Sequence, residues 1–214
     1  MRHSSLFCFC CSALAFSLGC GEPPDEPDAA SVAAYFGLED GLSRRYQAAS
    51  GLEEEHEFRL VPGSAGDSLT YDRTVRRGGF IVDDLTLRLR VSTTAGLEVT
   101  RLYDCVSRCG ELSAPIALLP WPLDEGRSLE SQVDVTLTGA EAGESTFQEQ
   151  HVVQVGASSS LEVPAGTFEA FAVIWSRQVE GGQGRSAALS FAPEVGFLRS
   201  EAFDAVTFEL AEAP

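Results

Sequence analysis

Six cysteines are the residues of this chain most able to do covalent or metal chemistry, and four of them lie in its first 20 positions. Cys8, Cys10 and Cys11 stand in an uncharged run, residues 6–18, that follows Arg2. A short basic start, an apolar stretch and small residues at its end are typical of a secretory signal. The run is shorter than the roughly 20 residues of a membrane-spanning helix. We therefore interpret residues 1–19 as a leader and these thiols as its apolar filler, not as a metal site.

Cys105 and Cys109 flank the tripeptide Val-Ser-Arg. If residues 97–104 and 110–118 form a hairpin, the three-residue loop places the two cysteines opposite each other, within reach of a disulfide bond. An oxidising compartment outside the cytoplasm favours that bond. A catalytic dithiol usually has two intervening residues at the start of a helix, and no helix is expected here. The sequence predicts a structural disulfide, with a redox pair as the alternative.

Two histidines, His56 and His151, remain after the leader, each alone on an expected strand. A zinc site would need further ligands beside them, so we expect a surface or core-edge role. The acidic runs 53–55 and 83–84 are interpreted as solvated charge. The segment GSAGDS at 63–68 lacks the spacing of a nucleophile elbow. We predict no catalytic residue, no metal ligand and no cofactor.

Arginines gather between residues 70 and 110 of a chain whose net charge is −17. Such an acidic chain is a poor partner for nucleic acid, because binding to phosphates needs a basic surface. Arg88 and Arg90 share one face of an expected strand, and Arg101 is placed to lie across from them. This group suits recognition of an anionic headgroup or of a partner's carboxylates. The alternative, which we favour, is cross-strand pairing with acidic residues.

Strand patterns dominate the chain after residue 34. LTLRLRV at 85–91 and QVDVTLT at 132–138 alternate apolar and polar residues, which is typical of half-buried strands. FEAFAVIW at 168–175 is apolar on both faces, as in a strand that is covered on both sides or central in a sheet. Further strands are expected at 53–61, 68–76, 97–104, 147–155, 186–192, 197–203 and 205–210. The sequence therefore predicts an all-β fold with little helix, an antiparallel sheet curved into a half-barrel or barrel-like form.

The segment before these strands is rich in Pro, Asp and Glu. Such a composition buries too little surface to order itself, so we expect residues 20–34 to be a flexible acidic tether to one domain at 35–214. LEDGLS at 38–43 and LDEGRS at 123–128 each open a run of strands, which indicates either two similar halves or a coincidence of turn-rich sequence. Trp121, between two prolines, is expected to plug the end of the sheet, with an exposed contact as the alternative.

The residues Ser17-Leu18-Gly19-Cys20 resemble the lipobox of bacterial lipoproteins. The resemblance implies that Cys20 is lipidated with palmitate-type chains and becomes the first residue of the mature, membrane-anchored protein. The family usually has Leu three places before the cysteine, whereas here Leu18 stands one place late. The alternative is ordinary cleavage after Gly19. Gly21, where inner-membrane lipoproteins of the enterobacterial type carry Asp, implies the outer membrane, facing the periplasm or the cell surface.

LEVPAGTFEAFAV at 161–173 and FAPEVGFLRSE at 191–201 resemble paired motifs of a broad group of bacterial envelope proteins. LLPWPLDEGRSLE at 118–130 resembles their strand-entry segment, although Leu129 and Arg44 stand where that group usually has Trp. The resemblance implies a β-rich domain similar to the half-barrel of lipoprotein-localisation carriers. It implies no enzymatic activity, but a non-catalytic envelope lipoprotein that binds an apolar or lipidic ligand. The alternative is a structural or protein-interaction module with an envelope protein as partner.

Overall fold

The structure is a computed structural model that describes residues 28–61, 67–104, 108–139, 143–201 and 206–212. Within these ranges, no helix has the length and the apolar character that crossing a membrane requires. The described part opens with a short helix, α1 (Ala29–Tyr35), and continues as strands. The strands are β1 (Ser43–Gln47), β2 (Leu52–Leu60), β3 (Ser68–Arg77), β4 (Phe80–Ser92), β5 (Gly96–Asp104), β6 (Arg108–Leu112), β7 (Ile116–Leu119), β8 (Ser128–Gly139), β9 (Gly143–Val163), β10 (Gly166–Val179), β11 (Arg185–Ala192), β12 (Gly196–Glu201) and β13 (Thr207–Leu210).

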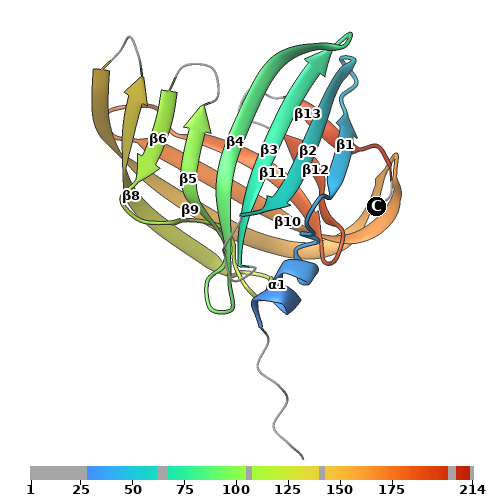
Figure 1. The fold of residues 1–214 in the computed structure, drawn as a ribbon. Coiled ribbons are helices and arrows are strands. Elements are labelled where there is room, and N and C mark those ends of the chain that lie inside the picture. Colours follow the sequence, from blue (N-terminus) through green and yellow to red (C-terminus); the bar gives the residue numbers. More distant parts are fainter. Residues whose placement is uncertain (1–27, 62–66, 105–107, 140–142, 202–205, 213–214) are drawn as a thin grey trace, which may run out of the picture.

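These strands form one antiparallel sheet that closes on itself (Figure 1). Neighbours follow the order β4-β3-β2-β1-β13-β12-β11-β10-β9-β8-β6-β5, and β4 pairs back onto β5. The result is a closed barrel of 12 strands, with β7 paired to β5 beyond the end of β6. The predicted all-β, antiparallel, barrel-like fold with little helix is confirmed, and of the two expected forms the barrel is closed.

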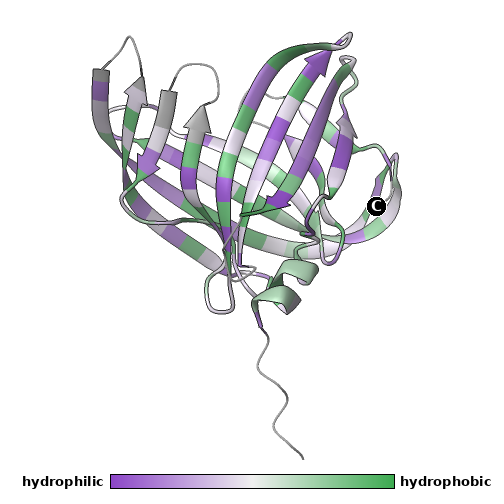
Figure 2. Ribbon diagram, viewed as in Figure 1, coloured by the Kyte–Doolittle hydropathy of each residue, from purple (hydrophilic) through white to green (hydrophobic). Residues whose placement is uncertain are grey.

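Side chains alternate between the interior and the outside of this barrel, as the period of two requires. In β4 the predicted pattern holds, because Leu89 and Val91 are buried and Arg90 is exposed. Figure 2 shows the same alternation of hydrophilic and hydrophobic residues along most strands. In β10 the inner face carries fully buried Val173, whereas Ile174 on the outer face stays 40% exposed. That strand is therefore covered on one face only.

The barrel consists of two similar halves, β1–β6 and β8–β13, each running as a meander of six strands. Gly41 and Gly126 open the two halves in the same way, each with a positive φ, of 78° and 82°. The amide of Gly41 donates to the carbonyl of Phe58, and that of Gly126 donates to the carbonyl of Val155. These turns are the LEDGLS and LDEGRS segments, so the strand order favours two similar halves over coincidence.

One end of the barrel is closed by α1 and by an aromatic group (Figure 1). Asp28 caps the helix by accepting from the amide of Ser31 at 2.8 Å, and Val32 is fully buried. Trp121 packs edge-on against Tyr35, with ring centroids 4.6 Å apart. Trp121 is thus the predicted plug. Residues 29–34, which the sequence analysis assigned to the tether, instead lie in this helix. Burial of Val32 in the core stabilises it.

The interior near α1 is filled by a single apolar cluster that joins both halves. Phe58, Leu69 and Leu89 of the first half share it with Val153 and Val173 of the second half. The helix residues Val32 and Phe36 belong to the same cluster. A second, smaller cluster lies where β1, β12 and β13 meet, around Tyr46, Leu198 and Phe208. The larger apolar cluster therefore contains residues of both walls together with residues of α1.

Candidate functional site

Two buried Glu–His pairs lie inside the barrel, one in each half. On β2, Glu54 Oε1 lies 2.6 Å from His56 Nε2. On β9, Glu149 Oε2 lies 2.9 Å from His151 Nε2. All four residues are at most 4% exposed. In both strands the two residues are separated by one position, so the period of two places them on the same inward face.

An arginine on the next strand completes each pair. Arg73 on β3 stands directly opposite His56, and its Nε donates to Glu54 Oε2 at 2.9 Å. Arg177 on β10 stands directly opposite His151 and donates to Glu149 Oε1. We call these groups the Glu54 cluster (Glu54, His56 and Arg73) and the Glu149 cluster (Glu149, His151 and Arg177).

Aromatic rings enclose both imidazoles. His56 lies between Tyr46 and Tyr71, with ring centroids 4.3 and 5.1 Å away. His151 stacks on Trp175 at 5.6 Å, and the indole Nε1–H of Trp175 donates to His151 Nδ1 at 3.2 Å. An indole nitrogen is only a donor, so Nδ1 of His151 accepts and its Nε2 carries the proton that faces Glu149. Tyr71 and Trp175 each stand two residues before the arginine of their cluster.

The clusters keep their carboxylates charged although these are buried. Burial by itself raises the pKa of Glu54, but the hydrogen bonds and charges of His56 and Arg73 outweigh it and hold that pKa below its usual value. The same balance, with His151 and Arg177, lowers the pKa of Glu149. Burial also lowers the pKa of His56, against the opposing influence of Glu54. Each buried carboxylate is therefore held charged by the histidine and the arginine of its cluster.

A buried arginine that has no carboxylate partner within the described ranges lies next to the Glu54 cluster. Arg44 on β1 stands opposite His56, is 4% exposed and donates to the carbonyl of Gly37 at 2.6 Å. Its guanidinium lies over the ring of Phe58, 5.9 Å from the centroid. Arg44 Nε and His56 Nδ1 are buried without a hydrogen-bond partner among the described residues. Burial lowers the pKa of Arg44.

The two clusters lie on opposite walls of the barrel, because β2 and β9 are six places apart in the closed order of 12 strands. They are not at the same height. Glu54 pairs with Tyr46, three residues after Ser43 at the start of β1, whereas Glu149 pairs with Val133, five residues after Ser128 at the start of β8. Measured from the first strand of its half, the Glu149 cluster therefore lies one inward-facing position farther along than the Glu54 cluster.

This arrangement stabilises charges but offers little that could react. Each imidazole Nε2 is already engaged by a glutamate, so neither histidine is a free base at that nitrogen. In the described part of the chain, no three or more His, Cys, Asp and Glu residues gather as metal ligands would. The expectation that His56 and His151 lie at the surface or core edge is wrong, since both are inside the barrel. The interpretation of Glu54 as solvated charge is wrong for the same reason.

Two pockets lie along the strands of the described residues. One, of about 150 Å³, is on the outer face and is lined by residues of β9, β10 and β11, among them Gln150, Ser176 and Gln178, which alternate with the inward-facing residues. The other, of about 370 Å³, lies at β1, β2 and β3 beside Ala211 and Glu212, and its lining combines outward-facing Glu53 with the inward-facing Tyr46 and Glu54. Neither resembles the apolar chamber of a lipid-binding barrel.

The predicted anion-contact arginines lie on the outer face of β4 and β5. Arg90 donates from two nitrogens to Glu98, at 3.0 and 2.8 Å, and Arg101 pairs with Glu111 at 2.5 Å. Arg88 stands opposite Arg101, with its Nε buried and without a hydrogen-bond partner among the described residues. Arg90 and Arg101 thus show the cross-strand pairing that the sequence analysis favoured, and anion contact stays a prediction.

The predicted lipidation site, Cys20, and one member of the predicted disulfide, Cys105, lie outside the described residues. The backbone of Cys109 is described, and it pairs with Tyr103 on the hairpin between β5 and β6. The expected hairpin is therefore present around 105–107. The disulfide stays a prediction.

The sequence analysis missed both clusters, although a signal for them was present. Glu-x-His occurs twice after the leader, at 54–56 and 149–151, and each is followed on the next strand by an aromatic-x-Arg motif, at 71–73 and 175–177. In a strand such spacing places both residues on one face. The recurrence of these two motifs in both halves indicates a shared role for these residues more strongly than either histidine does alone.

Comparison with known proteins shows the fold. No family model matches the chain, and no curated protein matches it. A solved structure of a candidate lipoprotein from Parabacteroides distasonis is 13% identical, with a TM-score of 0.52, and the match covers 84% of this chain and 99% of that one. A candidate exported protein with a YmcC-like fold from Bacteroides fragilis gives 13% identity and a TM-score of 0.52 over 84% and 98%. The likeness to lipoprotein-localisation carriers stays a prediction.

Proposed function

We propose that this chain is a non-catalytic lipoprotein of the bacterial cell envelope, and that its barrel is a rigid interaction module rather than a container. Export is supported by the leader and by the fold, which is shared with proteins described as a candidate lipoprotein and a candidate exported protein. The lipobox-like segment supports anchoring through Cys20, with Gly21 favouring the outer membrane. In this proposal the partner is a component of the envelope, not nucleic acid.

The observation that carries the proposal is the packing of the barrel interior. Phe58 and Leu69 of one wall and Val153 and Val173 of the other belong to one apolar cluster. The barrel interior also holds the Glu54 cluster and the Glu149 cluster, and within each of them the arginine donates to the glutamate. An interior used in this way leaves the outer surface and the strand ends for recognition.

A second candidate function is the sheltering of an apolar ligand inside the barrel. It is favoured by the strand number, since about eight strands already give an interior that side chains fill, and wider barrels leave room. The 12 strands of this barrel are in principle enough for a chamber. The apolar cluster that both walls share with α1, and the charged side chains inside the barrel, argue for the interaction module instead.

The envelope proposal is tested by metabolic labelling with palmitate, followed by separation of inner and outer membranes. The expected result is a labelled protein in the outer-membrane fraction and no label in the Cys20→Ala variant. A Cys8→Ala variant is the matched control, because it changes a leader cysteine and should leave labelling unchanged. An unlabelled wild-type protein among intracellular solutes would overturn the proposal.

A further inference from the structure

The hairpin between β3 and β4 projects three large apolar residues into solvent. Phe80, Ile81 and Val82 are 79%, 61% and 56% exposed. Figure 2 shows the hydrophobic stretch at the upper end of β4. Arg76 and Arg77 precede them on β3, so the hairpin end at 76–82, which we call the tip, combines a basic strand with an apolar one.

The tip is an ordered turn, not a loose loop. Arg77 pairs with Phe80 across a two-residue connection, Gly78-Gly79, whose φ angles are 56° and 84°. Positive φ at both central residues is the geometry of a type I′ turn, which matches the twist of a hairpin. The register shifts between Val75 and Arg76 and leaves Val82 as the extra residue of a β-bulge.

The apolar residues of the tip point to both faces of the hairpin. Phe80 and Ile81 are consecutive in one strand, so their side chains leave opposite faces. A flat partner surface would cover one of these faces and leave the other in water. A medium that surrounds the hairpin end covers both. We infer that the tip inserts into the interfacial region of a phospholipid bilayer, with Phe80, Ile81 and Val82 among the acyl chains.

The charges around the tip fit this placement. Arg77 is exposed, and no ion pair is seen for it within the described residues. Arg76 pairs with Glu55, and the acids that follow the tip are Asp83, which lies 3.0 Å from the Arg73 that it shares with Glu54, and Asp84. An anionic headgroup is attracted by Arg77, whereas the rest of a chain of net charge −17 is repelled by an anionic surface. Electrostatics thus orient the tip, and not the barrel wall, toward the lipid.

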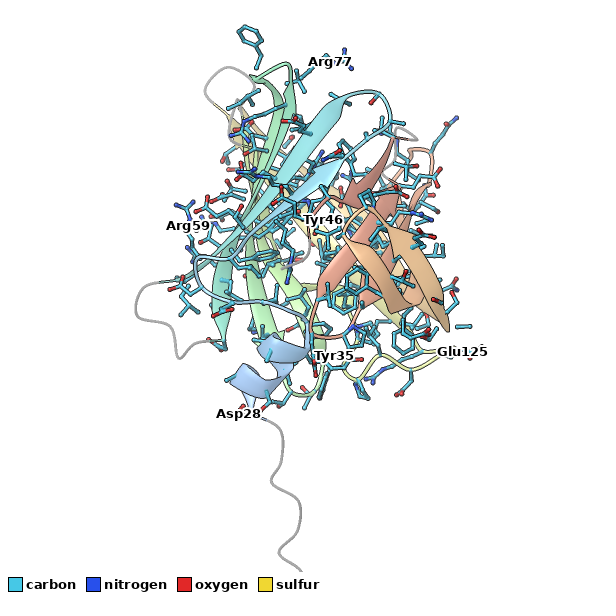
Figure 3. All side chains as sticks on the ribbon, turned by 90° about the vertical axis from the view of Figure 1, so that its right-hand side faces the viewer. Asp28, Tyr35, Tyr46, Arg59, Arg77 and Glu125 are labelled. Carbon is cyan, nitrogen blue, oxygen red and sulfur yellow. The ribbon has the colours of Figure 1, made fainter. Side chains whose placement is uncertain are left out.

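The tip lies at the end of the barrel opposite α1, as the positions of Arg77 and Asp28 in Figure 3 show. This inference rests on the proposed envelope function, because it needs a bilayer within reach. Eight Cα–Cα steps, across the seven residues 21–27, separate Cys20 from Asp28 in the sequence. Fully extended, they span at most about 28 Å. A tether of that length lets the α1 end stand away from the bilayer that holds the anchor, while the barrel tilts its tip onto the same surface.

The test places a fluorescent probe in the tip of the full chain, as Phe80→Trp, and adds vesicles of phosphatidylethanolamine and phosphatidylglycerol. We expect a blue shift of the added tryptophan emission and its quenching by brominated acyl chains. The wild-type protein corrects for Trp121 and Trp175. Ile174→Trp, on the outer face of β10, is the matched control and should show neither change. Adding Ile81→Ser and Val82→Ser to Phe80→Trp should weaken vesicle binding of the tip at least tenfold.

Unchanged, unquenched emission of the Phe80→Trp protein in the presence of vesicles would overturn the inference. So would a photo-crosslinker at position 80 that captures a protein and no lipid in intact cells, which would make the tip a protein-docking element. Because this readout is local to the tip, it is distinguishable from loss of the anchor. Failure of the envelope proposal is instead seen as a loss of palmitate label.

Discussion

In the Glu149 cluster both nitrogens of the imidazole have partners, whereas in the Glu54 cluster one ring nitrogen has none. His151 is held by Glu149 at Nε2 and by the indole of Trp175 at Nδ1. His56 is held by Glu54 alone and faces the buried cation of Arg44. The same residue types, placed on opposite walls, thus give one imidazole with a partner at each nitrogen and one whose Nδ1 has none among the described residues. We expect the first to act as a fixed structural element and the second to respond to pH.

The largest effect is expected from removal of either glutamate. Glu54→Ala or Glu149→Ala leaves a histidine and an arginine inside the barrel without their carboxylate. Breaking a buried ion pair costs about 3–5 kcal/mol, and we expect about 3 kcal/mol at each wall because Arg73 and Arg177 reach solvent. The measurement is the free energy of unfolding in urea.

The control for this pair of variants is Glu55→Ala, which removes the outward-facing neighbour of Glu54. Glu55 bonds to Arg76 at 2.7 Å on the exposed side of the sheet. Its loss should cost less than about 1 kcal/mol. A glutamate variant on either wall that costs no more than this control would contradict the account of that wall.

The next largest effect is expected in the pH dependence of stability, through His56 of the Glu54 cluster. Burial lowers the pKa of His56 from its usual 6.5, so the unfolded chain takes up the proton first on acidification. Stability should therefore fall as the pH drops below about 6.5, since the unfolded state binds more protons there. His56→Phe, which keeps a ring between Tyr46 and Tyr71, should flatten the curve between pH 6.5 and 5. Thermal melts across this range make the comparison.

Below pH 5, the two buried glutamates are expected to determine how stability depends on pH, in the wild-type protein and in the His56→Phe variant alike. The pKa values of Glu54 and Glu149 are held below the usual 4.5, so the stability they provide is lost as the pH falls from 4.5 through those lowered values. Persistence of the slope between pH 6.5 and 5 in the His56→Phe variant would show that another group causes it.

A smaller effect is expected at the indole of the Glu149 cluster. Trp175→Phe keeps an aromatic ring beside His151 but removes the N–H that Nδ1 accepts. Loss of one such hydrogen bond should cost about 1 kcal/mol. Nitrogen NMR of the imidazoles should show a shift for His151 and an unchanged His56, which serves as the internal control. Equal shifts at both rings would mean that the two clusters are coupled, against the view of two independent walls.

The smallest effect is expected outside the barrel. Arg90 and Glu98 pair on the exposed face of β4 and β5. A double-mutant cycle with Arg90→Ala and Glu98→Ala should give a coupling energy below about 1 kcal/mol that shrinks further at high salt. A salt-insensitive coupling as large as that of the interior clusters would remove the distinction between inner and outer ion pairs.

Local sequence patterns predicted most strands, because alternation and turn residues act over a few positions. The pattern of 85–91 predicted the inward residues of β4, and Gly41 and Gly126 marked the starts of the two halves. The upper end of β4 was missed because Phe80, Ile81 and Val82 do not alternate. Helix α1 was missed because its short, Ala-rich sequence is stabilised by burial of Val32, a tertiary contact.

The clusters depend on closure of the barrel, which no short pattern contains. Glu54 was interpreted as solvated because it lies in a run of three acids, and only the pairing of β2 with β3 brings Arg73 to it. Arg44 stands where the resembled group has Trp, and the sequence gives no sign that Gly37 and Gly196 leave space for a guanidinium there. Charged residues in alternate positions of a strand point inward or outward according to partners that are distant in the chain.

The central claim, that the barrel is a packed module and not a container, is tested most directly by native mass spectrometry of the protein extracted from membranes. We predict the mass of the processed chain with its covalent lipid, and no lipid-sized adduct that collisional activation removes. One dissociable apolar molecule per chain, retained in the Phe80→Ser variant whose tip is altered, would contradict the claim and establish the barrel interior as a binding chamber.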